Sequence, residues 1–247
     1  MKAALALSVL LAAAPARAAA PFAPGESITF RITYAHLLAG RARLTVGEAD
    51  TGGRAALEFV STARSEGFFA WLFGFRVRDR TIAVLDPASQ CSLRIEKTLR
   101  EGKAARDQEV AFDPAGFARV RDKKIRETDF TIEPCSLDIL SALYVTRLRG
   151  LPKDGKLELP VFDNGKRFRL AIEVLEREKI DLPSPLGKAT PVVVVEPRLV
   201  EGTGLFVKEK GARLKIWLTD DDRRVPVRMR SKVAVGSVSA DIERYEP

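Results

Sequence analysis

The sequence predicts a mainly β fold in which a large curved antiparallel sheet, a half-barrel or open barrel, holds one central helix on its concave face. Three features indicate this class. Runs of alternating apolar and polar residues, typical of strands with one buried face, recur along the chain. Turn signals such as Asp163-Asn-Gly-Lys166 separate them. Residues 136–149 form the one convincing helix, with strands before and after it.

An antiparallel sheet of a dozen or so strands tends to curl, and its concave side is the natural cover for an apolar helix. The chain is long enough to build one large β domain. We therefore expect a single β-rich domain at residues 21–247. It comprises a β half at 25–134, the helix at 136–149 and a second β half at 156–246.

The first 20 residues are typical of a secretory signal peptide. Lys2 precedes a short apolar run, and Ala16-Arg-Ala18 places small residues where a signal peptidase reads them. The run is too short for a membrane anchor, and no cysteine directly follows it to accept a lipid. We expect an exported, periplasmic protein whose mature chain begins at Ala19 or within two residues of it.

The first β half opens with a strictly alternating run, in which Ile28, Phe30 and Ile32 share one face. Turns rich in Gly, Asp and Pro separate the runs that follow. The expected strands are residues 27–34, 41–48, 55–64, 76–85, 92–100, 106–113 and 117–121. A basic, less patterned stretch through residues 123–126 then leads toward the helix.

Residues 67–75 form the most unusual segment, with four phenylalanines and one tryptophan in nine residues. One interpretation is a short helix or loop that plugs the core. The other is a hydrophobic lip that lines a ligand cavity or touches a membrane. On the second interpretation, the candidate ligand-binding residues are Phe68, Phe69, Trp71, Phe73 and Phe75.

The helix carries a broad apolar stripe of Leu137, Leu140, Tyr144 and Leu148, which Ile139 and Leu143 widen. We expect this stripe to pack on the sheet, with Tyr144 as a further candidate ligand contact.

The ends of the helix carry their own signals. Ser136 can cap the start and Asp138 falls in the first turn, whereas Arg147 and Arg149 suit the negative end of the helix dipole. Gly150 ends it.

The second β half contains the strongest hairpin signal, at residues 163–166. The run Val192–Val195 is continuously apolar and indicates a strand buried on both faces. The expected strands are residues 156–162, 167–176, 190–196, a short edge at 205–207, 213–218, 225–230 and 232–245.

Cys91 and Cys135 are the two cysteines of the chain. Export would place them where disulfides persist, so we expect them to be paired, with the helix start tied to a strand of the first half. The alternative is a reactive thiolate at Cys135, near a helix N-terminus.

The chain is basic, with a formal charge of +8 that falls to +6 when Lys2 and Arg17 leave with the signal. An exported protein seldom meets nucleic acid, and arginines such as Arg76, Arg78 and Arg80 alternate along strands instead of forming a patch with aromatics. A solvated sheet face is one interpretation, and attraction to anionic membrane headgroups is the other.

Residues for catalysis or metal binding are not evident. Asp220-Asp221-Asp222 lacks the spacing of a calcium loop and suits a hairpin tip. His36 has no second ligand or base beside it, and Ser141 has no base on its helix face. We find no metal spacing and no cofactor fingerprint, and expect a protein that is not an enzyme.

Several segments together resemble the domain-of-unknown-function family 3108 (DUF3108) of exported bacterial proteins. They are Gly25-Glu26 with the strand ending at Tyr34, the helix from Leu137 to Tyr144 with Arg147, the Gly165-Lys166 hairpin, and Ile216 to Arg228. The similarity covers almost the whole mature chain and implies a fold and a compartment, without an activity.

The expected curled sheet is similar to the half-barrels of periplasmic lipoprotein carriers. We therefore expect a carrier of a lipid, acyl chain or lipoprotein in envelope maintenance. The alternative is a non-catalytic structural module that meets an envelope protein. An aliphatic cavity of roughly several hundred Å³ would favour the carrier, and a filled interior would favour the module.

Overall fold

The computed structural model describes residues 20–66, 76–122, 125–152, 156–202, 213–232 and 236–247. The strands of the first half are β1 (Ser27–Tyr34), β2 (Leu37–Asp50), β3 (Ala55–Ser65), β4 (Arg78–Leu85), β5 (Ser92–Glu101), β6 (Ala104–Asp113), β7 (Phe117–Asp122) and β8 (Ile125–Thr131). The helix α2 (Ile139–Arg149) precedes β9 (Lys156–Asp163), β10 (Lys166–Ile180), β11 (Thr190–Gly202), β12 (Arg213–Thr219), β13 (Pro226–Lys232) and β14 (Ser237–Glu246).

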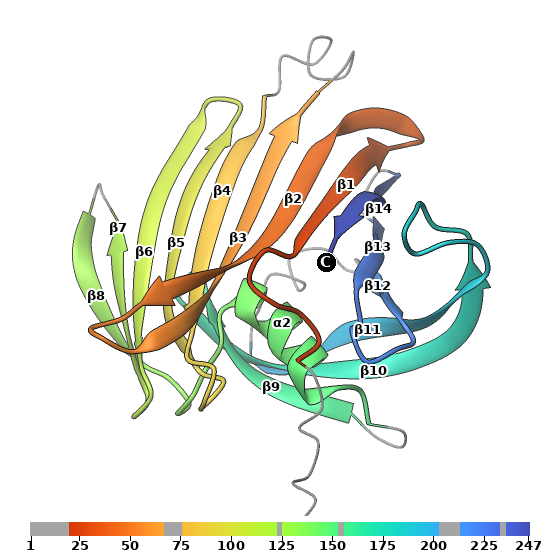
Figure 1. Ribbon diagram of the computed structural model, residues 1–247. Helices are drawn as coiled ribbons and strands as arrows, with labels where there is room; N and C mark the ends of the chain where they lie inside the picture. The colour runs from red at the N-terminus through yellow and green to blue at the C-terminus, as the bar shows by residue number, and fades with distance from the viewer. Residues whose placement is uncertain (1–19, 67–75, 123–124, 153–155, 203–212, 233–235) are drawn as a thin grey trace, which may run out of the picture.

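All fourteen strands belong to one antiparallel sheet, in the order β8-β7-β6-β5-β4-β3-β2-β1-β14-β13-β12-β11-β10-β9. The first and last strands of the chain pair in the middle of this order, while β8 and β9 form the two edges. Figure 1 shows the sheet curling round α2. The predicted fold class, a large open curved sheet with one helix on its concave side, is confirmed.

Alternation along the strands places one set of side chains against the helix. Phe30, Phe59 and Ile95, from β1, β3 and β5, are buried in the same core as the helix residues Leu140 and Tyr144. The core therefore lies on the concave side of the sheet, and the charged alternate residues of these strands face outward.

The helix starts later than expected. Residue Leu137 is paired with β9 through two backbone hydrogen bonds, from its N–H to Pro160 O (2.9 Å) and from Phe162 N–H to its carbonyl (2.8 Å). Because this pairing needs extended backbone, residues before 139 cannot be helical. The N-cap is Asp138 rather than Ser136, and its carboxylate accepts hydrogen bonds from the N–H groups of Leu140 and Ser141.

Burial extends almost all round the helix. The stripe residues Leu137, Leu140 and Tyr144 are buried, as expected, but so are Thr146 and Arg147. Arg147 and Arg149 lie in the last turn of the helix, as expected, but the burial of the Arg147 side chain was not predicted.

The strand predictions differ at several places, and β2 begins at Leu37 instead of residue 41. Residues 125–131, within the stretch interpreted as less patterned, form the edge strand β8. The long strands β10 and β11 extend beyond their expected ends. The run Val192–Val195 is buried throughout, as predicted, whereas the expected edge at 205–207 lies outside the described residues.

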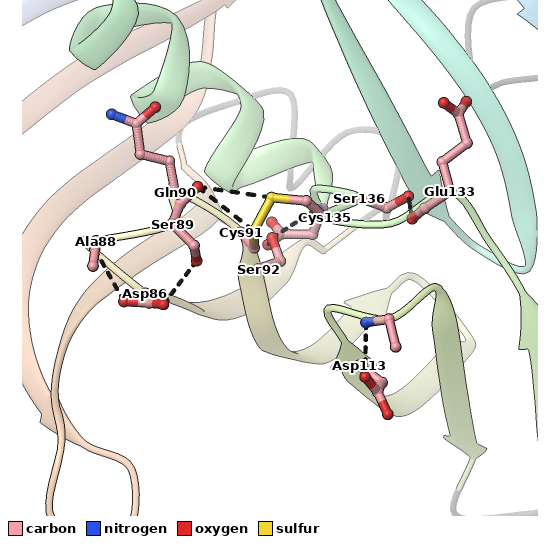
Figure 2. Close-up of a disulfide and its surroundings, with 12 residues drawn as sticks. Asp86, Ala88, Ser89, Gln90, Cys91, Ser92, Asp113, Glu133, Cys135 and Ser136 are labelled. Atoms are coloured by element: carbon pink, nitrogen blue, oxygen red, sulfur yellow. Dashed lines mark hydrogen bonds between the residues drawn. A yellow bond between two sulfur atoms is a disulfide. The ribbon is translucent and has the colours of Figure 1, made fainter.

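A disulfide joins Cys91 to Cys135, the pairing expected from the sequence, with their Cα atoms 4.7 Å apart. Figure 2 shows it between the start of β5 and the segment that enters the helix. Beside it, Ser92 donates its hydroxyl to the Asp138 carboxylate (2.8 Å) and accepts the Asp138 N–H (2.9 Å). The start of α2 is thus fixed to β5 by a covalent bond and two hydrogen bonds.

Candidate functional site

An apolar hollow of about 180 Å³ lies between α2 and strands β10 to β13. The helix contributes residues spaced three and four apart, which therefore share one face: Ile139, Ala142, Leu143 and Thr146. Leu170, Val195 and Leu218 of the sheet are buried beneath it. The hollow exists because two curved surfaces of aliphatic side chains meet here without interdigitating completely.

The chemistry of this lining is uniform. The lining residues of the hollow include one with a hydroxyl group, Thr146. This hydroxyl donates a hydrogen bond to the Ala142 carbonyl within the helix (2.8 Å). The hydrogen-bonding capacity of Thr146 is thus directed into its own helix. A molecule in the hollow would meet hydrocarbon almost everywhere, so the hollow is suited to an apolar group and poorly suited to a polar one.

The rim of the hollow is partly open to solvent. Leu143 of the helix and Leu214, Ile216 and Met229 of the sheet are half-buried. These aliphatic side chains remain accessible inside a concave region, where a hydrocarbon ligand would remove them from water. At about 25 cal/mol per Å² of apolar surface, such burial is the main source of affinity that this site offers.

A neighbouring face of the helix is held by a buried ion pair. The Arg147 guanidinium donates to both carboxylate oxygens of Glu26, at 2.6 and 2.8 Å, and also to the carbonyls of Pro21 and Arg223. Both charged side chains are almost completely inaccessible to solvent. The pair therefore ties the end of α2 to the N-terminal segment and to the β12–β13 turn.

Aromatic rings surround this anchor. Tyr144 is stacked on Phe59 with ring centroids 3.8 Å apart, and Phe22 packs edge-on against both rings. Burial raises the pKa of the Tyr144 hydroxyl well above its usual value. Tyr144, predicted as a ligand contact, does not line the apolar hollow, because it points from the other side of the helix.

A second polar cluster lies at the helix start. Asp138 is completely buried, and burial raises the pKa of its carboxyl, an effect opposed by the hydrogen bonds from Ser141 and Ser92. The Ser141 hydroxyl donates to this carboxylate at 2.6 Å and is itself fully buried. This geometry caps the helix and gives Ser141 no contact with solvent.

The other predicted site residues are dispersed. The aromatic residues Phe68, Phe69, Trp71, Phe73 and Phe75 and the signal segment 1–19 lie outside the described residues. His36 is exposed, and Asp221 bonds Arg223 and Thr219 in the β12–β13 turn. Within the described ranges, no group of three or more potential metal ligands gathers, and no helix is long and apolar enough to cross a membrane.

Two buried ion pairs were missed by sequence reasoning: Arg147 with Glu26, and Lys97 of β5 with Asp163 of β9. For the first there was a signal, because position 147 follows Leu140 by seven residues and Tyr144 by three and so lies on the predicted apolar stripe. A charge on such a stripe requires a buried partner. The partner, 121 positions away, could not be identified from spacing.

Comparison with known proteins adds a family and a structural relative. No curated protein matches the chain. The crystal structure of a beta-barrel-like protein of domain of unknown function DUF1849 from Brucella abortus is similar, with a TM-score of 0.58 and 10% sequence identity over 90% of this chain and 96% of that one. At this identity the likeness shows the fold alone. A family model described as "Protein of unknown function (DUF3108)" matches residues 29–243, so the chain belongs to this family.

Proposed function

We propose that the protein binds the hydrocarbon part of a lipid, an acyl chain or a lipoprotein, as a non-catalytic periplasmic carrier in envelope maintenance. The observation that supports this role is the apolar lining of the hollow under α2, whose Thr146 hydroxyl is bonded within the helix. Such a site attracts an acyl chain through the hydrophobic effect and offers little to a sugar, a nucleotide or an ion.

The volume sets the size of the group that can enter. A dry aliphatic cavity of about 150 Å³ is enough to bind a benzene ring, whereas pockets for whole drug-sized ligands measure about 300–1,000 Å³. A hollow of about 180 Å³ accepts the end of one chain. Binding of a longer part requires α2 to move away from β10 to β13.

The small volume also favours a second candidate, a structural or interaction module of the cell envelope. Most residues of α2 are buried, so the fold already covers most of the helix surface. On this alternative the hollow is a packing defect and the outer surface or the sheet edges meet a protein partner. The two candidates differ in whether an acyl chain binds under the helix.

The test is a titration with the fluorescent fatty acid cis-parinaric acid. Leu143→Trp should fill the hollow from its open rim and weaken binding at least tenfold. The matched control, Leu148→Trp, changes the same residue type on the same helix away from the hollow and should bind like the wild type. Circular dichroism establishes that both variants fold. Equal binding by both, or no binding by the wild type, would favour the structural module.

A further inference from the structure

The outer face of the sheet carries a row of arginines that the strand register brings together. Arg31 of β1 lies directly opposite Arg41 of β2, Arg41 opposite Arg64 of β3, and Arg64 opposite Arg78 of β4. Neighbouring strands are only about 4.8 Å apart. The alternating arginines of the sequence, expected to be dispersed on a solvated face, therefore form one continuous cationic row.

A second row runs beside the first. Arg43 of β2 lies opposite Thr62 of β3, Thr62 opposite Arg80 of β4, and Arg80 opposite Thr98 of β5. Both rows border a groove of about 840 Å³. Six arginines line it, Arg41, Arg43, Arg64, Arg78, Arg80 and Arg100, together with a single acidic residue, Asp79.

Like charges directly opposite on a sheet repel each other, so this arrangement needs anions. At the β1 to β3 end the protein supplies them. Glu243 pairs with Arg31 (3.1 Å) and Arg41 (2.7 Å), and Glu66 pairs with Arg41 and with Arg64 (2.7 Å). Farther along the groove, Arg100 is bonded to Asp107.

The two arginines of β4 differ from their neighbours. Arg78 and Arg80 are exposed on one face of the strand, and within the described part of the chain neither has a carboxylate at ion-pair distance. They lie two residues apart, a separation of about 6.6 Å along a strand. Thr62 and Thr98, on either side of Arg80, add exposed hydroxyls. The middle of the groove thus presents two guanidinium groups without a described carboxylate partner, and two hydroxyl groups beside them.

We propose that this groove binds a phosphate group, held between Arg78 and Arg80. A guanidinium donates two parallel hydrogen bonds to a phosphate, and the several oxygens and double charge of a phosphate monoester allow it to accept from two such forks at once. A groove of this volume suits a discrete phosphorylated ligand. The phosphate comes either from a soluble compound or from a lipid headgroup, and the site is separate from the apolar hollow on the concave side.

The test compares the double variant Arg78→Gln/Arg80→Gln with Arg119→Gln/Arg121→Gln. The control arginines also lie two residues apart on the outer face of a strand, β7, but pair with Asp129 and Glu127. Both variants lose the same charge. Calorimetric titration with inorganic pyrophosphate, at constant ionic strength set with chloride, measures the soluble source. Sedimentation with vesicles of phosphatidic acid, whose headgroup is a phosphate monoester, and phosphatidylcholine, against phosphatidylcholine alone, measures the headgroup source.

We expect the Arg78/Arg80 variant to bind at least tenfold more weakly to whichever probe binds the wild type, and the control variant to bind like the wild type. Binding of pyrophosphate identifies a soluble ligand class, and binding of anionic vesicles alone identifies a headgroup. Equal losses in both variants would show general charge attraction and overturn the proposal, as would no binding of either probe. Leu143→Trp should leave this binding unchanged, so the outcome is independent of the proposed acyl-chain site.

Discussion

The replacement Glu26→Gln tests the anchor of the central helix. Gln preserves the shape of the side chain but removes its charge, leaving the Arg147 guanidinium, which is 0% exposed, without a counterion. Removing one partner of a buried ion pair costs about 3–5 kcal/mol. For a protein with a typical stability of about 5–15 kcal/mol, that loss is large enough to shift the urea midpoint clearly.

The assay is urea unfolding followed by far-UV circular dichroism at neutral pH, with the disulfide intact. Arg147→Met and the double variant complete a thermodynamic cycle, and the double variant should cost less than the sum of the single ones because it leaves no unpaired buried charge. Asp129→Asn breaks an exposed pair with Arg119 and serves as control. A loss for Glu26→Gln no larger than for Asp129→Asn would refute the reasoning.

Three further predictions concern the helix, the disulfide and acid stability. Leu140→Ala, at a buried position, should cost about 2–5 kcal/mol in urea unfolding, whereas the exposed Arg149→Ala should cost far less; similar small losses would mean that the helix is peripheral. Cys91→Ser/Cys135→Ser opens a link between residues 44 positions apart and should cost about 2–4 kcal/mol, and an unchanged urea midpoint would contradict this. Hydrogen bonds from Arg41 and Arg31 lower the pKa of the Glu243 carboxyl from its ordinary value of 4.5 to about 2. The ionised carboxylate therefore stabilises the fold fully above pH 4.5, and this stabilisation is lost as the pH falls toward 2. The melting temperature of Glu243→Gln should therefore fall less steeply than that of the wild type between these pH values, and parallel curves would exclude this contribution.

The sequence predicted burial best where the pattern of a single strand determines which residues face the core. Side chains alternate across a strand with a period of two, so Ile28 and Phe30 could be assigned to the core from their spacing alone. The same reasoning placed Val192–Val195 in a strand buried on both faces. The edge strand β8 was missed because its exposed positions carry charges such as Glu127 and Asp129, whose partners Arg119 and Arg121 belong to the neighbouring strand.

Features that depend on distant pairing could not be predicted. The helix starts at Ile139 because the backbone of Leu137 is hydrogen-bonded to β9. The residues around Leu137 contain no sequence pattern that predicts this pairing. The apolar hollow is formed by one helix and four strands, so its lining is visible only when the sheet has curled. The arginine row likewise depends on the register of four strands, since a shift by one residue would move every side chain to the other face.

The measurement that tests the central claim most directly is native mass spectrometry of the protein purified under mild conditions from the cells that produce it. A site that binds the end of an acyl chain should give a population with one added lipid mass, and Leu143→Trp should lose that adduct while Leu148→Trp keeps it. A wild-type spectrum that shows protein mass alone, from material whose lipids were never stripped by detergent, would contradict the account of the hollow as a ligand site.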